Sequence, residues 1–372
     1  MRADFGAVRQ VTPDEAARLL DDGAALLDTR EVNEWRAGYV PGATLLPPAE
    51  VVARAAEVVP DREKPVVVYC AVGARSLRAA HQLAALGYRN VVSVAGGIVR
   101  WKAEGRPVEL PAGTPSVVNN PRYARHLVMP EVGPEGQAKL AQAKVLVIGA
   151  GGLGSPALLY LAAAGVGTIG IVDFDVVELS NLQRQVVHAD NRVGVKKTES
   201  AALTIRGLNP ETKVVEHTEM LTDGSVDRLI GGYDVVIDGT DTFETRYWLN
   251  DAAVRAAIPV VHASVFRFEG QLTVFVPFEG PCYRCLYPTP PPPELAPGCS
   301  VAGVLGVVPG VMGMLQATET VKLILGIGDP LVGRLLIWDA LDGTFGELAL
   351  QRDPDCPACG VRAAERVAVA SA

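Results

Sequence analysis

The 372-residue sequence predicts an α/β protein with two successive domains. Short apolar runs with the length of buried strands, such as residues 66–69 and 145–148, alternate with longer helical segments in both parts of the chain. A cluster of glycines directly follows the second of these runs, within residues 149–154. Because 49% of the residues are apolar and 20% are charged, the chain can bury a core in each domain.

The charge and the first residues narrow the possible partners. The formal net charge is −8 and there is no basic block, whereas a nucleic-acid site needs concentrated Lys and Arg. Residues 1–16 have no apolar core behind a basic head, so no signal peptide is predicted there. We therefore expect a cytoplasmic protein that binds neither nucleic acid nor a membrane.

A small α/β domain is expected over residues 1–108, with strands at 24–28, 66–69 and 91–94. Its second strand runs into Cys70, and a helix that Gly87 ends follows the short loop. There Cys70 would face loop N–H groups and a helix N-terminus, with Arg75 nearby, a setting that lowers the pKa of a thiol. A cysteine that ends an apolar strand can equally be inert core.

Three segments of this domain resemble a single-domain rhodanese: LLDTREVNEWRAGYVPGA, CAVGARS and AGGIVRWKAEGRPV. Rhodaneses are sulfurtransferases that carry sulfur as a cysteine persulfide. The resemblance implies that Cys70 is the sulfur carrier and that residues 70–75 form the anion-binding loop. Tyr39 departs from the family, which often has His at that position.

Residues 109–121 are rich in Pro, Gly, Ser and Asn without periodicity, which predicts a linker. The second domain is expected over residues 122–360. Its main unit, residues 144–175, is expected to form a strand, a glycine turn, a helix and a second strand. A phosphate would lie at the turn, against the helix N-terminus that begins at Ser155 and Pro156. The turn glycines are Gly149, Gly151, Gly152 and Gly154, and the acidic residues near a ribose would be Asp173 and Asp175.

Other interpretations of this unit remain open on sequence grounds. No residue between Lys144 and Asp173 is charged, as in a membrane span, but the glycines and one proline divide the segment into pieces of strand and helix length. A glycine turn can also lack a ligand or bind NAD.

Charged residues later in the domain suit phosphoryl chemistry. Arg184 and Lys197 could neutralise a triphosphate, while Asp241, just past a strand predicted at residues 233–238, could hold Mg²⁺. The carboxyl ends of parallel strands face the ligand crevice, which is where Asp241 would lie.

The segments RYARH, GAGGLG, DFD, SNLQRQ, KKTES and DGTD together resemble the MoeB/ThiF family of ubiquitin-activating-like adenylyltransferases. The resemblance implies a Rossmann-like doubly wound α/β domain that binds ATP. It also implies a homodimer, in which Arg125 reaches the site of the other subunit. His126, Lys196 and Thr242 depart from the usual family residues. The residues that would line ATP are Gly152, Asp173, Ser180, Asn181, Arg184, Lys197, Asp241 and Thr242.

Two C-x-x-C pairs predict a structural zinc site with four cysteine ligands, in preference to a redox pair. The ligands would be Cys282, Cys285, Cys356 and Cys359.

Cys299 stands alone after a proline-rich loop, and the residues alone do not decide between a packing role and a chemical role for it. The family resemblance implies a covalent link from Cys299 to a carrier protein. Residues 300–314 are expected to form core and dimer contact before a helix at 318–325, and residues 361–372 a disordered tail.

Together the two resemblances imply an adenylyltransferase and sulfurtransferase. ATP would adenylate the C-terminal glycine of a ubiquitin-like sulfur carrier protein ending in Gly-Gly. A persulfide on Cys70, supplied by a persulfide sulfur donor, would then give a thiocarboxylate. Molybdopterin biosynthesis is the expected pathway, with thiamin, tRNA thiolation and cysteine synthesis as alternatives. Alternatives of another class are an NAD-linked oxidoreductase and a carrier-binding scaffold without catalysis. Fused members of the family usually carry the rhodanese second, whereas here it comes first.

Overall fold

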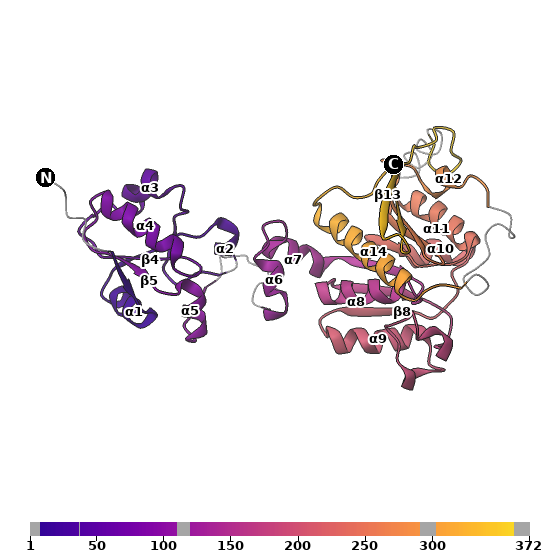
Figure 1. Cartoon of the computed structure of the whole chain (residues 1–372), viewed down its shortest axis with the longest axis horizontal. Helices are drawn as coiled ribbons and strands as arrows, with labels where there is room; N and C mark the ends of the chain where they lie inside the picture. The colour runs from indigo at the N-terminus through magenta and orange to yellow at the C-terminus, as the bar shows by residue number, and fades with distance from the viewer. Residues whose placement is uncertain (1–7, 37, 110–119, 291–302, 361–372) are drawn as a thin grey trace. The chain divides into compact units, whose positions relative to one another are not determined.

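The computed structural model describes residues 8–36, 38–109, 120–290 and 303–360 (Figure 1). The chain divides into two compact units, Met1–Gln137 and Ala138–Ala372. The domain limits expected from the sequence, 1–108, 109–121, 122–360 and 361–372, stay predictions. The expected tail and Cys299 lie outside the described residues.

The first unit contains a five-stranded parallel sheet with the order β1-β5-β4-β2-β3. Its strands are β1 (Arg9–Val11), β2 (Ala25–Asp28), β3 (Thr44–Leu45), β4 (Val66–Tyr69) and β5 (Val91–Val94). Its main helices are α1 (Pro13–Asp21), α2 (Val32–Arg36), α3 (Val51–Val58), α4 (Ala74–Ala85) and α5 (Gly97–Ala103). The unit also includes η2 (Pro121–Tyr123), α6 (Ala124–Leu127) and the first half of α7 (Gly133–Gln142).

Strand β4 is buried on both faces of this sheet. Val66 and Val68 pack into one core cluster with residues of α3 and α4, whereas Val67 and Tyr69 pack into another with residues of α1 and α5. Such two-sided burial is why β4 is a continuous apolar run rather than an alternating one. The sequence prediction for this strand is confirmed at both ends.

The second unit contains an eight-stranded sheet with the order β13-β12-β11-β10-β9-β6-β7-β8. The five strands from β8 to β10 are parallel, and β11, β12 and β13 pair antiparallel. The strands are β6 (Lys144–Ile148), β7 (Thr168–Val172), β8 (Lys213–His217), β9 (Val235–Asp238), β10 (Val260–Phe266), β11 (Glu269–Phe275), β12 (Arg334–Asp339) and β13 (Thr344–Ala349).

Helices cover the parallel part of this sheet (Figure 1). Leu146 and Ile148 of β6 share a core cluster with α10 and α11, while Val147 faces the start of α8. Helix α8 packs against α14. The helices are α8 (Gly154–Ala164), η3 (Leu179–Asn181), η4 (Asp190–Arg192), α9 (Lys197–Leu208), α10 (Asp223–Ile230), α11 (Phe243–Ala256), α12 (Tyr283–Leu286) and α14 (Val307–Leu325).

Strands β2 and β9 begin one and two residues later than the sequence predicts, at Ala25 and Val235, and two other boundaries differ by more. The second strand of the main unit ends at Val172 rather than Asp175, because the Asp173 side chain accepts hydrogen bonds from loop N–H groups there. Helix α14 begins at Val307 and not at Thr318. Pro309 is in its first turn, where a missing N–H costs nothing, and Gly313 lets the helix approach α8, since a Cβ there would be 2.1 Å from the Leu153 carbonyl oxygen.

The membrane alternative for residues 144–175 is not supported. This segment folds as β6, α8 and β7. Over the ranges given above, no helix combines the length and the apolar character that crossing a bilayer requires.

Candidate active site

A cleft of about 860 Å³ opens at the carboxyl ends of β6 and β9. The strand order reverses between these neighbours. From β6 the sheet continues through β7 and β8 on one side, and from β9 it continues through β10 on the other. Ligands of doubly wound folds bind at such a switch point. The volume is in the range of pockets for nucleotide-sized ligands.

Glycine is required at two positions of the turn after β6. Gly149 has φ +92°, and a Cβ there would be 2.9 Å from the Gly239 carbonyl oxygen. A Cβ at Gly154 would be 1.9 Å from the Gly149 carbonyl oxygen. The backbone of the turn therefore packs directly against itself and against the loop after β9, without side chains between them. Gly149, Gly151 and Gly152 line the cleft.

The turn is held at Ala150 from two sides. Asp173 Oδ2 accepts a hydrogen bond from the Ala150 N–H at 2.9 Å. His188 Nε2 is 3.0 Å from the Ala150 carbonyl oxygen, and its Nδ1 is 2.9 Å from the Ser200 hydroxyl. Burial lowers the pKa of His188 to about 4, so the ring is neutral at pH 7. Because a carbonyl only accepts, Nε2 carries the proton and Nδ1 accepts from Ser200.

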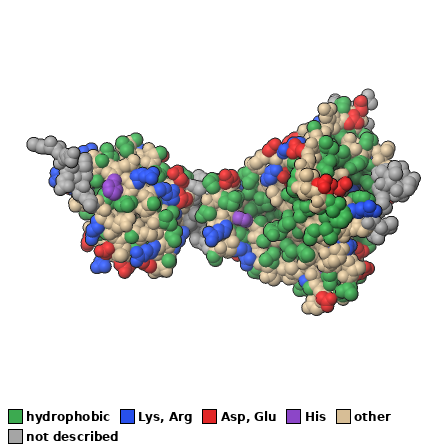
Figure 2. Space-filling model, viewed as in Figure 1, with side chains coloured by type: hydrophobic (Ala, Val, Ile, Leu, Met, Phe, Trp, Pro, Cys, Tyr) green, Lys and Arg blue, Asp and Glu red, His purple; other side chains and the backbone are tan. Residues whose placement is uncertain are grey.

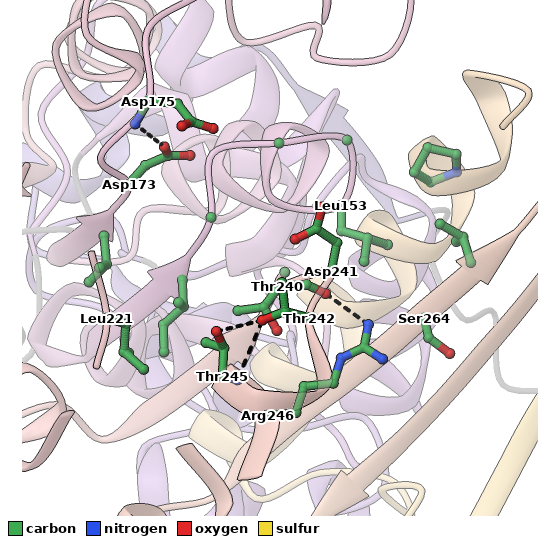
Figure 3. A pocket seen from close by; sticks show the side chains of 18 of the residues that line it. Leu153, Asp173, Asp175, Leu221, Thr240, Asp241, Thr242, Thr245, Arg246 and Ser264 are labelled. Atoms are coloured by element: carbon green, nitrogen blue, oxygen red, sulfur yellow. Dashed lines mark hydrogen bonds between the residues drawn. The ribbon is translucent and has the colours of Figure 1, made fainter. Parts of the chain in front are cut away.

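The acidic side of the cleft contains an ion pair. Lys197 is buried, and its Nζ is 2.9 Å from Asp175 Oδ2. Asp173 Oδ1 accepts from the Asp175 N–H at 2.9 Å, which places both acidic residues at the end of β7, as Figure 3 shows. A phosphate entering the cleft would compete with Asp175 for the Lys197 ammonium group.

Arg184 lies beside the glycine turn. A Cβ on Gly152 would be 3.5 Å from Arg184 Cδ, so the arginine stem packs against the turn. Its Nη1 donates to the Ser180 carbonyl oxygen at 3.2 Å, which leaves other guanidinium hydrogens available to a ligand. Asn181 and Gln185 line the same wall of the cleft.

The loop after β9 is positioned by a fully buried carboxylate. Asp238 accepts from His262 Nδ1 at 2.7 Å and from the N–H and hydroxyl of Thr240 at 2.9 and 2.7 Å. Burial alone would raise the pKa of Asp238, but the His262 hydrogen bond and nearby positive charge hold it below its usual value. Burial lowers the pKa of His262, so a neutral ring donates to an ionised carboxylate.

Arg246 of α11 fixes the far side of this loop. Its Nη2 donates to the Thr240 carbonyl oxygen at 2.8 Å, and its Nε is 3.9 Å from Asp238 Oδ2. Asp241 and Thr242 follow on the exposed part of the loop and line the cleft (Figure 3). The buried network thus holds the backbone while the Asp241 carboxylate stays accessible to a cation or a ligand.

Four cysteine sulfurs converge where β11, α12 and the C-terminal loop meet. All lie within 4.8 Å of one another, with closest approaches of 3.5 Å for Cys285 and Cys359 and 3.6 Å for Cys282 and Cys356. Hydrogen bonding to Cys359 and burial raise the pKa of Cys282, so the crowded sulfurs cannot all ionise without a cation. Four convergent thiols match the ligands of a tetrahedral soft-metal site.

A second candidate site lies in the first unit, at the end of β4. Cys70 Sγ accepts a hydrogen bond from the Gly73 N–H at 3.1 Å. Burial raises the pKa of this thiol, but hydrogen bonds from Ser76 and from the N–H groups of Gly73 and Val72 more than offset it, so the pKa falls below the usual value. Cys70 is therefore predisposed to be a thiolate.

The structure brings most of the predicted site residues together and leaves some apart. The described cleft lining includes neither Ser180 nor Gly154, and Arg125 lies exposed on α6 in the first unit. The assigned roles of these residues stay predictions. Sequence reasoning missed Gln185 as a site residue, although it ends the SNLQRQ segment. It also missed His188 and Arg246, which lie in none of the segments quoted above.

Comparison with known families assigns both units. Residues 12–104 match the rhodanese-like domain, and residues 123–358, more than half of the chain, match the ThiF family. The SAMP-activating enzyme E1 of Haloferax volcanii is 54% identical over 239 residues, which are 64% of this chain and 88% of that protein. The sulfur carrier protein adenylyltransferase of Thermus thermophilus is 48% identical over 250 residues, 66% of this chain and 92% of that protein.

Two further proteins extend the comparison. The probable adenylyltransferase/sulfurtransferase MoeZ of Mycobacterium tuberculosis is 50% identical over 255 residues, which are 68% of this chain and 65% of that relative's length. Among solved structures, E. coli MccB with ATP is similar at a TM-score of 0.57 and 26% identity, over 66% of this chain and 76% of that one.

Proposed function

Because the chain belongs to the ThiF family and has a rhodanese-like domain before the ThiF domain, we propose that it activates and sulfurates a ubiquitin-like sulfur carrier protein. It is an enzyme of the adenylyltransferase and sulfurtransferase class. The observation that carries the proposal is the convergence of the glycine turn, Asp173 and the Asp241 loop at one switch-point cleft.

In the first half-reaction, the terminal glycine carboxylate of the carrier attacks the α-phosphorus of ATP. Pyrophosphate leaves, and an acyl-adenylate forms. The bare turn at Gly151 and Gly152 admits the phosphates, and Arg184 and Lys197 offset their charge. Asp241 is the proposed residue that would hold Mg²⁺, which supplies charge neutralisation for the leaving pyrophosphate. Asp173 would bind the ribose hydroxyls.

In the second half-reaction, the outer sulfur of a Cys70 persulfide attacks the activated carbonyl carbon, and AMP leaves. A thiolate then attacks Cys70 Sγ, which forms a disulfide and releases the carrier thiocarboxylate. The order follows from chemistry, since a carboxylate becomes an electrophile only once adenylation supplies a leaving group. Cys299 is the thiol that the family resemblance implies for a covalent link to the carrier.

Zn²⁺ is the proposed ion for the four cysteines, where it would staple the C-terminal loop to α12. We also propose a homodimer in which Arg125 of each chain reaches the nucleotide site of the other. A persulfide on another molecule is the proposed sulfur source.

Thiols at Cys70 and in the cysteine cluster suit a reducing compartment such as the cytoplasm. Molybdopterin biosynthesis is the proposed pathway, with thiamin, tRNA thiolation and cysteine synthesis as alternatives.

The direct test combines the purified protein with ATP, Mg²⁺ and candidate Gly-Gly carrier proteins. Pyrophosphate release that depends on one carrier, and on its terminal glycine, is the expected result. An NAD-linked oxidoreductase would instead bind NAD in preference to ATP, and a scaffold without catalysis would release no pyrophosphate with any carrier. Either outcome would overturn the proposal, and the carrier that responds identifies the pathway.

A further inference from the structure

Glu34 faces the Cys70 loop from a separate element, helix α2. Both of its carboxylate oxygens accept from Arg75, with Nη1–Oε2 at 2.6 Å and Nη2–Oε1 at 2.7 Å. Arg75 is the cation that the 70–75 loop itself carries beside the sulfur-bearing residue. This bidentate geometry is the strongest form of an arginine–carboxylate pair, and it engages two guanidinium N–H groups that a ligand of Cys70 would otherwise be free to use.

The pair is held in place by its surroundings. Glu34 Oε2 also accepts from the Glu31 N–H at 3.0 Å, so the carboxylate is fixed at the start of α2. Burial would raise the pKa of Glu34, but the hydrogen bonds from Arg75 and Glu31 hold it below its usual value. The side chains are only 36% (Arg75) and 21% (Glu34) exposed. The carboxylate therefore stays charged at pH 7 and cancels much of the Arg75 charge at the loop.

A second guanidinium near the loop also has a carboxylate partner, through a single hydrogen bond. Arg100 packs against Gly96, whose nitrogen would be 3.3 Å from a Cβ on Gly73 of the loop. Arg100 Nε donates to Glu104 Oε1 at 2.8 Å. Val72 of the loop is 64% exposed and presents an apolar side chain. Among the residues that the structure describes, the Cys70 site thus offers N–H groups for one anionic sulfur, and the two nearby guanidinium groups both have carboxylate partners.

We propose that Glu34 is a specificity-determining residue that adapts the Cys70 site to organic persulfides and against free thiosulfate. The inference rests on the proposed function, in which Cys70 carries sulfur. Glu34 acts through Arg75, by holding the guanidinium away from the incoming donor. The exposed Val72 side chain supplies apolar contact for the organic part of a persulfide donor.

The two donors place different demands on charge. In both cases the Cys70 thiolate attacks the outer sulfur of the donor and the donor S–S bond breaks. A persulfide R–S–SH gives Cys70–S–SH and releases R–S⁻. Thiosulfate gives Cys70–S–S⁻ and releases sulfite, SO₃²⁻. The thiosulfate reaction therefore brings a dianion to the thiolate and releases another dianion, which requires nearby cations. Arg75 and Arg100 are nearby, but they are paired with Glu34 and Glu104.

The test measures sulfur transfer by the full chain to cyanide, with thiosulfate and with cysteine persulfide as donors. Wild-type protein should use the persulfide with the higher kcat/KM. Glu34→Gln keeps the side-chain length and one acceptor but removes the charge, and should raise kcat/KM for thiosulfate about tenfold, mainly by lowering KM, because one opposing charge near Arg75 is lost. The kcat/KM for cysteine persulfide should stay within about twofold.

Two further variants make the test specific. Glu63→Gln removes an exposed carboxylate whose Arg89 partner is 3.3 Å away, so it changes net charge equally and should leave both donors unaffected. The double variant Glu34→Gln/Arg75→Met should lose the thiosulfate gain, because the gain requires the released guanidinium. The inference would be overturned if the wild type used both donors with equal kcat/KM, or if Glu34→Gln did not raise kcat/KM for thiosulfate. Sulfur found on Cys70 in the same experiment would still support the proposed function. If neither donor places sulfur on Cys70, the proposed function fails as well.

Discussion

The Cys70 loop and the glycine turn share one backbone plan, and a different kind of anion is proposed for each. Each follows a buried parallel strand, β4 or β6, and leads into a helix, α4 or α8. The first loop keeps a reactive side chain and directs the Gly73 N–H toward its sulfur. The second loop has glycines at positions 149 and 154, so its backbone segments can pack closely and a larger ligand can approach. The chemistry of each site therefore depends on which atoms fill the loop, more than on the strand–loop–helix plan.

The largest effect is expected for a variant of Asp241, which should impair the nucleotide site and leave the Cys70 site intact. Asp241→Ala removes the exposed carboxylate of the β9 loop without touching the buried Asp238 network, so the fold should persist. ATP–pyrophosphate exchange should fall by about a hundredfold or more, as expected for losing a metal ligand at a charged transition state. Asp342→Ala, an exposed carboxylate of the β12–β13 turn, is the matched control and should exchange normally. Near wild-type exchange in Asp241→Ala would contradict the assignment of this loop.

Arg184 should come next. Arg184→Ala removes one donor group beside Gly152 and should cost about 3 kcal/mol of transition-state stabilisation, roughly a hundredfold in exchange rate. Sulfur loading of Cys70 should not change, because that site has its own N–H donors. Exchange rates and a thiosulfate or persulfide loading assay on one preparation give both numbers. An effect below twofold on exchange would remove Arg184 from the proposed machinery.

The cysteine cluster should affect stability more than nucleotide binding. Cys356→Ser removes one of the four convergent sulfurs, so bound zinc, expected at about one ion per chain, should be lost and the Tm of the second unit should drop. ATP affinity in the protein that remains folded should change far less. Elemental analysis, thermal unfolding and ATP titration measure the three quantities. A metal-free wild type with the same Tm as the variant would contradict the structural role.

The smallest effect concerns pH at the first site. Because hydrogen bonds lower the pKa of Cys70, its alkylation should reach half-maximal rate at a pH below the ordinary thiol value of about 8.5. Ser76→Ala removes one of the groups that lower this pKa, so the midpoint should move to higher pH. Peptide mass spectrometry after brief iodoacetamide treatment follows Cys70 separately from the clustered cysteines. A midpoint at or above 8.5 in the wild type would mean that burial dominates at this thiol.

The same comparison shows what the sequence could and could not predict. Strand β4 and the glycine turn were predictable because continuous apolar runs and adjacent glycines are local signals. His188 was not, because it acts on Ala150, which is 38 residues away in the sequence. Arg246 was not, because residue type alone does not show that it folds back onto Thr240, in the loop before its own helix. The early start of α14 was also hidden, since Gly313 looks like a helix breaker until its contact with Leu153 is known.

The charge state of the Cys70 loop likewise needed the fold. Arg75 in the motif predicts a positive cradle, but Glu34 lies far away in sequence and pairs with it in space. Lys197 was expected to face a triphosphate; it lines the cleft, and there its ammonium group pairs with Asp175. In both cases the residue type was predictable and the partner that sets its available charge was not.

The central claim, that activation and sulfur transfer belong to separate sites, is tested most directly by the variant Cys70→Ala. With carrier protein, ATP and a persulfide donor, this variant should release pyrophosphate at the wild-type rate and form no thiocarboxylate. In the reciprocal variant, Asp241→Ala, the Cys70 peptide should still gain one sulfur atom by mass spectrometry while pyrophosphate release fails. Normal thiocarboxylate formation by Cys70→Ala, from a persulfide donor and without free sulfide, would contradict the account.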